Sequence, residues 1–391
     1  MPQRARVQAL DAMSQAMDWN IVLALARRHG LLPLFERHLS QLEEASVPHP
    51  VRAEIWVHAE SVRRRNLAMS SELARIVGTL QEAGIESIAY KGPTLALQAY
   101  GDPSLREFGD LDLLVRRDRA LDAKDVLGGL GYTMQKPLGQ AQQAALIASP
   151  RLYELPLIDG AQQRLVELHW RTDPDVDVLA LDQVEWWQEL PRMVIEGRDV
   201  RVLPPEELLV TLCLHGTKHF WSSLGWLVDI AELIRSQADL DWHLVTQLAE
   251  RHRCRRRVQL GLLLARDILD APVDARQLPT VHHDAIASTI VEAWFDQSPR
   301  TPTLSTALLL NLRLHDDARR RVAYVWNASV APGWGEWARW RLPGFLSFLY
   351  FPLRAARLTA KYCLPMLNRP IPRTPAAATP RTPPPRPHST G

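Results

Sequence analysis

Hydrophobic and polar positions alternate with a period of two in the stretch 110–115. Asp110 and Asp112 alternate with Leu111 and Leu113, and the apolar run continues to Val115. Side chains of a β-strand point alternately to its two faces. The pattern therefore predicts a strand whose leucines enter a core, while the two carboxylates project together from the other face at the start of the strand.

A strand pair is predicted further along the chain. The stretches 151–158 and 163–170 are rich in β-forming residues and are joined around Asp159-Gly160, a dipeptide typical of hairpin turns. In the second stretch, Glu167 and His169 fall on the same face. We expect Glu167 to face Asp110 and Asp112 across the sheet, unless it is a hairpin residue that faces water.

A short apolar stretch, 85–90, predicts another strand, which ends at Lys91-Gly92. Pro93 suits the first turn of a helix, and 94–100 is the predicted helix. When a strand ends in Lys-Gly at the start of a helix, backbone N–H groups, the positive end of the helix and an ammonium group lie close together. This arrangement favours the binding of phosphate. The alternative is a tight turn with a solvated lysine.

Candidate nucleotide-binding residues follow from this junction: Lys91, Gly92, Thr94 and Arg106, the last being a second cation before the acidic pair. Only five of the 46 basic residues are lysines, so a lysine at this position stands against the bias of the chain. The carboxylates Asp110, Asp112 and Glu167 are the candidate catalytic residues and ligands of Mg²⁺ or Mn²⁺, since hard cations prefer oxygen ligands. A solvated acidic face on an edge strand is the alternative for the aspartates.

Periodicity and composition divide the chain into five stretches. Helical spacing before Gly84 is shown by Leu67, Leu73, Ile76, Val77 and Leu80. Pro204-Pro205-Glu206-Glu207 is a helix start. The predicted organisation is an N-terminal helical region (1–80), a mixed-sheet core (81–203), a helical domain (204–300), a helical, arginine-rich C-terminal region (301–368) and a Pro-rich tail (369–391) expected to be disordered.

Composition narrows the class of protein. The 391 residues are 46% hydrophobic and 23% charged, values of an ordinary globular chain, and the formal net charge of +2 gives no case for a nucleic-acid partner. Three widely spaced cysteines form neither a disulfide framework nor a metal clip. Neither a signal peptide nor a transmembrane segment is evident. These features favour a cytoplasmic protein.

One histidine pair requires a separate interpretation. His215 and His219 lie four residues apart on a predicted helix, a spacing that would suit zinc, but no third ligand is evident. We expect His215, Lys218 and His219, with Asp229 on the next helix, to lie near the cleft between helical domain and core. They are candidate contacts of nucleotide or acceptor, as is His169; ordinary hydrogen bonding between structural elements is the alternative.

Several motifs together resemble one protein family. They are Lys-Gly-x-Thr-Leu from Lys91, the Gly-Asp-Leu-Asp-Leu-Leu-Val run from Gly109, Gly131-Tyr132, Val166-Glu-Leu-His-Trp170, His215-Gly-Thr-Lys-His-Phe-Trp221 and Trp226-Leu-Val-Asp-Ile230. This set resembles the uncharacterised bacterial nucleotidyltransferases of the polymerase-beta-like superfamily, over most of residues 15–365. One departure is that the superfamily's usual Gly-Ser start, whose serine touches a phosphate, is replaced here by Lys91-Gly92. A similar Lys-Gly start is found in abortive-infection-type toxin nucleotidyltransferases.

The resemblance implies an α+β fold, with a polymerase-beta-like nucleotidyltransferase core of mixed sheet and flanking helices plus N- and C-terminal helical regions. It implies the same three carboxylates, and a metal-dependent transfer of an NMP group from an NTP such as ATP to an unidentified small-molecule, peptide or protein acceptor. Members often accompany biosynthetic gene clusters. Self- or protein-nucleotidylation is a second enzymatic hypothesis. A catalytically silent nucleotide-binding scaffold or partner protein of a biosynthetic pathway is the alternative from another class.

Overall fold

The computed structural model describes residues 17–39, 47–149, 151–176, 178–274, 276, 284–295, 309, 311–340 and 342–363. The first part of the N-terminal region and the tail predicted for 369–391 lie outside these residues. The elements are α2 (Trp19–Arg28), α3 (Leu32–Leu39), α4 (His49–Glu82), β1 (Ser87–Ala89), α5 (Pro93–Tyr100), η2 (Pro103–Leu105), β2 (Asp110–Val115), η3 (Arg117–Arg119), α6 (Ala120–Gly129), β3 (Tyr132–Met134), α7 (Gln140–Ala148), β4 (Glu154–Asp159), β5 (Leu165–His169), α8 (Val184–Glu189), β6 (Arg192–Ile195), β7 (Arg198–Arg201), α9 (Pro205–Lys218), α10 (Leu224–Ser236), α11 (Trp242–Arg251), α12 (Arg255–Leu269), α13 (Asp284–Phe295), α15 (Ala318–Ser329), α16 (Trp334–Arg339), η5 (Gly344–Leu349), α17 (Tyr350–Leu358) and η6 (Thr359–Cys363).

The strands of the described residues form one mixed sheet in the order β3-β4-β5-β2-β1-β7-β6. β2 lies in the middle, with β5 parallel to it on one side and β1 antiparallel on the other. The predicted hairpin is confirmed as the antiparallel pair β4 and β5. The sheet and its surrounding helices make the chain α+β, as predicted.

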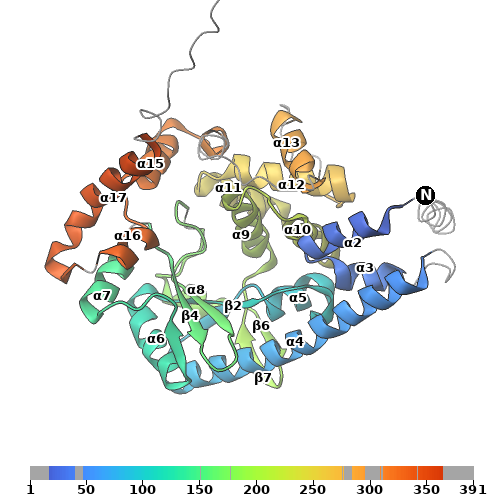
Figure 1. Ribbon diagram of the computed structural model, residues 1–391, viewed down its shortest axis with the longest axis horizontal. Helices are drawn as coiled ribbons and strands as arrows, with labels where there is room; N and C mark the ends of the chain where they lie inside the picture. Colours follow the sequence, from blue (N-terminus) through green and yellow to red (C-terminus); the bar gives the residue numbers. More distant parts are fainter. Residues whose placement is uncertain are drawn as a thin grey trace, which may run out of the picture.

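The two faces of the sheet have different partners because the strand side chains alternate. Leu113 and Leu168 pack in one buried cluster with residues of α4 such as Ile76. Leu114 and Ile88 join a second cluster made mostly by the helices α9 to α12. Figure 1 shows α4 (blue) below the sheet and α9 and α10 on its opposite side. The polar side chains of β2 and β5 therefore face the helices α9 and α10.

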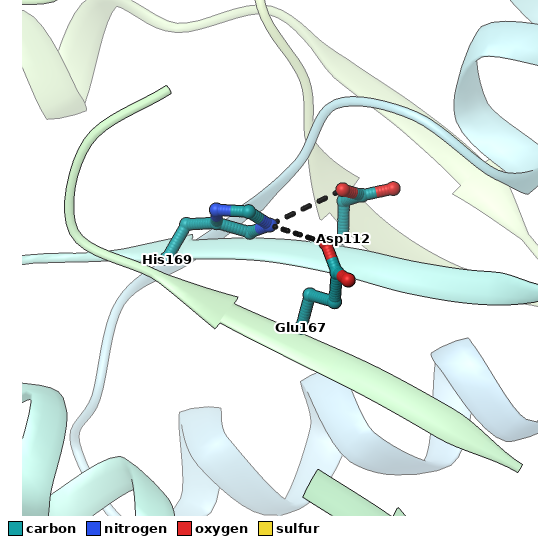
Figure 2. A group of neighbouring side chains, drawn as sticks. All are labelled: Asp112, Glu167 and His169. Atoms are coloured by element: carbon teal, nitrogen blue, oxygen red, sulfur yellow. Dashed lines mark hydrogen bonds and ion pairs between the residues drawn. The ribbon is translucent and has the colours of Figure 1, made fainter. Parts of the chain in front are cut away.

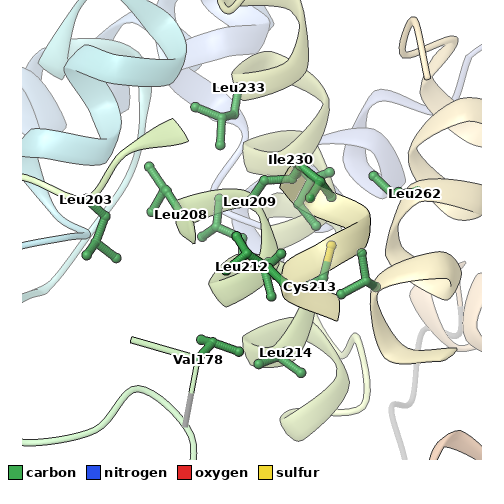
Figure 3. Close-up of a cluster of buried hydrophobic side chains, with 14 of the residues drawn as sticks. Val178, Leu203, Leu208, Leu209, Leu212, Cys213, Leu214, Ile230, Leu233 and Leu262 are labelled. Atoms are coloured by element: carbon green, nitrogen blue, oxygen red, sulfur yellow. The ribbon is translucent and has the colours of Figure 1, made fainter. Parts of the chain in front are cut away.

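The helical side has a continuous apolar core. Leu208, Leu209, Leu212 and Cys213 of α9 meet residues of α10 and α12 there (Figure 3). The predicted start of this helix is confirmed, since Pro205 is its first residue and fixes a helical φ where an N–H is not needed. No described helix combines the length and apolarity that crossing a bilayer would need.

The helix predicted before Gly84 is confirmed as α4, which ends at Glu82, and Gly84 itself has a φ of 68°. Leu73, Ile76 and Leu80 are buried, as their spacing predicts. Leu67, which we placed in the same apolar stripe, is 60% exposed. The sheet cluster packs on α4 from Met69 onward, so Leu67 has no part in it.

Candidate active site

Asp112 and Glu167 lie side by side on neighbouring strands. β2 and β5 run parallel in a register that pairs Asp112 with Glu167, and both side chains leave the sheet on the face opposite Leu113 and Leu168. Asp112 is 3% exposed and Glu167 is partly exposed. The period-two patterns of the two strands thus bring the predicted carboxylates together, because a parallel pair with this register places residues of the same face next to each other.

His169 lies against both carboxylates. Its Nε2 is 3.2 Å from Oδ1 of Asp112 and 3.3 Å from Oε2 of Glu167 (Figure 2), and its Nδ1 is 3.6 Å from Oε2 of Glu154. Burial alone would lower the pKa of His169, but the hydrogen bonds to Asp112 and Glu167 outweigh it and raise this pKa to about 9. At neutral pH His169 is therefore an imidazolium that balances the surrounding carboxylates.

Asp110 begins β2, opposite Leu165 of β5, and is more exposed than Asp112. Burial, followed by the charge of Asp112, raises the pKa of Asp110 to about 6. Burial would also raise the pKa of Asp112, but Lys91 and His169 hold it well below its usual range. Two carboxylates on one strand face thus titrate differently, since only Asp112 has two cations in contact.

Lys91 is bonded to Asp112. Its Nζ lies 2.7 Å from Oδ1 of Asp112, and the side chains of both are largely buried. β1 runs antiparallel to β2 with Ala89 opposite Leu113, so the chain leaves β1 beside the start of β2. Burial would lower the pKa of Lys91, but the charge of Asp112 outweighs it and raises the pKa. The lysine is therefore a buried, charged member of the site and not a solvated turn residue.

Gly92 and Thr94 shape the turn that follows. Gly92 has φ 57° and ψ −129°, a conformation that favours glycine, and a Cβ there would lie 3.3 Å from the carbonyl oxygen of Asp110. Thr94 donates its hydroxyl to the carbonyl oxygens of Ala89 and Lys91. Gly92 thus allows the junction to approach β2, and Thr94 closes the turn on itself; a contact of either with nucleotide stays a prediction.

Arg106 reaches across to the helical domain. Its Nε and Nη2 donate to the two carboxylate oxygens of Asp229 on α10, at 2.8 and 3.0 Å, and Tyr100 donates to the same carboxylate at 2.7 Å. The sequence placed Arg106 beside phosphate and Asp229 beside substrate. The structure joins them to each other, which connects the loop before β2 to α10.

His215, Lys218 and His219 come from the end of α9, as predicted. The imidazoles of His215 and His219 are 4.7 Å apart at their centroids, and each lies close to the ring of Trp226. Burial, and then the charges of nearby lysines, lower the pKa of both histidines, which for His219 falls to about 4. The two rings are thus neutral at pH 7 and form an aromatic group with Trp226.

Three residues of the site were missed at the sequence level. Glu154 lies directly opposite His169 in the β4–β5 pair. The rings of Tyr153 and Tyr90 flank the imidazole of His169, with centroids 6.0 and 5.6 Å away. The period of two places Glu154 on one strand face, but only the hairpin register, which the turn sets, shows that this face is the one carrying Glu167 and His169.

The donor atoms fit a divalent cation. Asp112, Glu167 and His169 each offer one ligand atom, and these atoms lie within 4.8 Å of one another. Asp110 is not part of that group but shares a face of β2 with Asp112. Carboxylate oxygens on adjacent strands are the ligands that Mg²⁺ and Mn²⁺ prefer. The carboxylates are therefore the part of the site that is chemically suited to a hard metal ion, since the imidazolium of His169 offers no lone pair.

Comparison with known proteins gives one family and several distant structures. No curated protein matches the chain. One similar structure is the solution structure of the antibiotic-resistance factor ANT(2'')-Ia, with a TM-score of 0.32 and 16% identity over 48% of this chain and 92% of that one. Another is the crystal structure of ANT(2'')-Ia with adenylyl-2''-tobramycin, with a TM-score of 0.32 and 17% identity over 48% of this chain and 98% of that one. An antigenic nucleotidyltransferase-like protein from Paracoccidioides brasiliensis has a TM-score of 0.30 at 18% identity and covers 55% of this chain and 95% of its own.

Because these TM-scores are low, nothing about activity or acceptor follows from the likeness to those structures. The family match is different in kind, since it rests on the sequence and spans the sheet, the carboxylates and the helices α9 to α12. The model of a family described as "uncharacterised nucleotidyltransferase" matches residues 15–270, well over half of the chain, and the protein belongs to that family.

Proposed function

We propose that this protein is a metal-dependent nucleotidyltransferase that moves an NMP group from an NTP to a hydroxyl or phosphate of a small-molecule, peptide or protein acceptor. The observation that carries the proposal is the parallel register of β2 and β5, which sets Asp112 beside Glu167. Asp110 on the same strand face adds a third carboxylate. A merely solvated acidic face would not bury Asp112 and flank it with two cations.

The metal ligands in this proposal are Asp110, Asp112 and Glu167, and the ion is Mg²⁺ or Mn²⁺. His169 is instead a counter-ion, because its raised pKa keeps it protonated at neutral pH. When bound, the metal would supply Lewis-acid stabilisation of charge on the oxygens of the reacting phosphoryl group. The buried hydrogen bonds from Lys91 and His169 orient the Asp112 carboxylate before any ligand arrives.

Phosphate charge would be met by Lys91 and Arg106. Lys91 ends its strand at the glycine turn, where α5 begins and presents its free N–H groups. Asp229 holds two nitrogens of the Arg106 guanidinium, and among the described residues its third nitrogen, Nη1, makes no hydrogen bond. Preorganised cations of this kind stabilise charge as it develops on transferring phosphoryl groups. The neutral rings of His215, His219 and Trp226 are proposed contacts of the nucleotide or the acceptor.

The decisive experiment uses Asp112→Asn with Asp118→Asn as its matched control. Asp118 lies just past the end of β2, and its side chain is 64% exposed. Each protein is incubated with one labelled NTP at a time, Mg²⁺ or Mn²⁺, and an extract of the host. Pyrophosphate release and labelled products, including labelled protein, are measured. We expect transfer by the parent and by Asp118→Asn, and none by Asp112→Asn, because an amide is a poorer ligand of Mg²⁺.

Two results would contradict this assignment. Transfer that persists in folded Asp112→Asn would place the chemistry elsewhere. Complementation of the host's deletion phenotype by Asp112→Asn would favour the alternative, a nucleotide-binding scaffold or pathway partner, because a binding role does not need that charge. Label on the protein itself would instead identify self- or protein-nucleotidylation.

A further inference from the structure

A cavity of about 240 Å³ lies between α9, α12, α15 and the segments that precede β4 and follow β5. Arg151 contributes from the segment before β4, Lys218 from the end of α9, and Arg257 from α12. Asp173 and Asp175, after β5, complete the charged part of the wall. Three cations thus line this cavity together with two carboxylates.

The two carboxylates already have partners. Nη1 of Arg257 lies 3.5 Å from Oδ1 of Asp173, and Nη2 lies 4.0 Å from Oδ2 of Asp175. Asp173 also accepts the backbone N–H groups of Asp175 and Val176, and Asn327 of α15 donates to Asp175 at 3.3 Å. Arg257 and these donors thus engage both acids, and the three cations of the wall exceed the two carboxylates by one charge.

The hydrogen bonds of the two remaining cations to described residues go to neutral oxygens. Nη1 of Arg151 donates to the carbonyl oxygen of Asn327 at 2.5 Å, and Nζ of Lys218 donates to the hydroxyl of Tyr153 at 3.1 Å. Within the part of the chain that the structure describes, neither forms an ion pair with a carboxylate. Burial lowers the pKa of both groups, helped by the charge of Arg354 on Arg151 and of Lys91 on Lys218. Buried cations without a carboxylate partner favour the binding of an anion.

Two side chains, Tyr153 and His169, connect this cavity to the candidate catalytic carboxylates. Lys218 lies over the Tyr153 ring, 4.7 Å from its centroid. The other neighbour of that ring is the imidazole of His169, stacked at 6.0 Å, which itself bonds Asp112 and Glu167. A molecule held at Arg151 and Lys218 would thus lie next to the candidate active site.

We infer that this cavity binds the anionic end, a carboxylate or a phosphate, of the acceptor molecule. The inference rests on the proposed function, since it names the class of acceptor for that reaction. Arg151 and Lys218 hold the anion, and the nucleophilic group of the same molecule extends past Tyr153 toward Asp112. The wall from α15 lies outside residues 15–270, so acceptor recognition here includes a part of the chain that the family match does not cover.

The first test is calorimetry on the full chain with inorganic phosphate and, separately, with acetate. Arg151→Gln and Lys218→Met should weaken binding of at least one of these anions about tenfold or more, the loss of a charge-assisted hydrogen bond. Arg192→Gln, in β6 beside a different cavity, should retain parental affinity. Lys91→Ala measures how much of the same anion binds at the nucleotide junction. Unfolding midpoints verify that each variant is folded. If Arg151→Gln does not fold, the binding measured with Lys218→Met tests the proposal.

Two calorimetric results would overturn the anion site: no saturable binding of either anion by the parent, or binding lost in Lys91→Ala and kept in Arg151→Gln.

A second experiment measures transfer from labelled ATP to a small-molecule extract of the host. The extract is first treated with phosphatase or amidated at its carboxylates. The pretreatment that removes the product identifies the anion. Arg151→Gln should transfer label more slowly than the parent when the extract is limiting, and the two rates should become equal when the extract is in excess. Equal rates of the parent and Arg151→Gln at limiting extract would overturn the acceptor assignment.

The two proposals can fail separately. Absence of transfer in every extract, with phosphate or acetate still bound through Arg151, would remove the proposed function and, with it, the acceptor role, while the anion site would stand. Transfer that depends on Asp112 but not on Arg151 or Lys218 would keep the function and place the acceptor elsewhere.

Discussion

Lys91 and Asp112, 21 residues apart in the chain, form a buried ion pair of 2.7 Å at the centre of the candidate active site. The pair joins the end of β1 to the start of β2. It supplies the site with a fixed cation, and it makes the carboxylate an anion at all ordinary pH values. Because both groups are buried, removing Asp112 leaves Lys91 without its carboxylate, and removing Lys91 leaves Asp112 with His169 as its one contacting cation.

Lys91→Met should therefore lower the free energy of unfolding by about 3 kcal/mol, since a buried carboxylate that loses one of its two cations is costly. The double variant Lys91→Met/Asp112→Asn should recover part of this loss, because it removes both charges of the pair. Urea denaturation of the parent, both single variants and the double variant measures the coupling. Additive losses would mean that the two groups do not interact energetically.

The pKa of His169 predicts a loss of stability at alkaline pH in the chelator-treated protein. The folded pKa, about 9, lies above the ordinary value of 6.5. The protonated imidazole therefore stabilises the fold fully below pH 6.5, and this contribution disappears as the pH rises through about 9. The integrated effect is about 3 kcal/mol. His169→Gln should flatten the unfolding free energy between these pH values; an unchanged alkaline slope in this variant would contradict the imidazolium assignment.

His315 should show the opposite pH dependence. It is 2% exposed and packs against Arg257 of α12, near Arg320 and Arg321. Burial and then these charges lower its pKa to about 3, although Asp317 raises it slightly. A histidine that stays neutral in the fold gives its full contribution to stability above pH 6.5. Below pH 6.5 the free energy of unfolding falls by up to about 1.4 kcal/mol per pH unit. His315→Gln should reduce this acid slope, whereas the exposed control His243→Gln should not.

The parts of the site that depend on local pattern could be predicted from the sequence. The faces of β2 and β5, the hairpin and the strand-to-helix turn at Gly92 follow from alternation and turn chemistry within a few residues. They were enough to bring Asp110, Asp112 and Glu167 to one face of one sheet.

The parts that depend on packing between distant segments could not be predicted. Arg106 meets Asp229 across 123 residues, and Asn327 meets Asp175 across 152. The hydrophobic periodicity of the sequence does not predict which helix end will face which loop. For the same reason the sequence placed Arg106 on phosphate alone, and gave no sign of the cavity behind Tyr153.

The contact between Arg106 and Asp229 gives the last prediction. Asp229 holds Nε and Nη2 of the guanidinium, which aims the remaining nitrogen while joining the loop before β2 to α10. Arg106→Gln should weaken binding of Mg·ATP about tenfold or more, because it removes a preorganised cation from the phosphates. Arg201→Gln is the matched control: Arg201 also pairs with a carboxylate, Glu86, at 2.8 Å, but it lies in β7, which β1 separates from β2. Calorimetry at a temperature where all variants are folded gives the affinities.

Asp229→Asn separates two roles of this contact. If Asp229 positions Arg106 for phosphate, the amide variant should bind Mg·ATP more weakly than the parent, in the same direction as Arg106→Gln but by less, because the guanidinium is kept and only its orientation is loosened. Tighter binding by Asp229→Asn would mean instead that the carboxylate competes with phosphate for the guanidinium. Equal affinity in the parent, Arg106→Gln and Arg201→Gln would show that Arg106 only joins the core to α10, and Lys91 would then be the phosphate-binding cation of the junction.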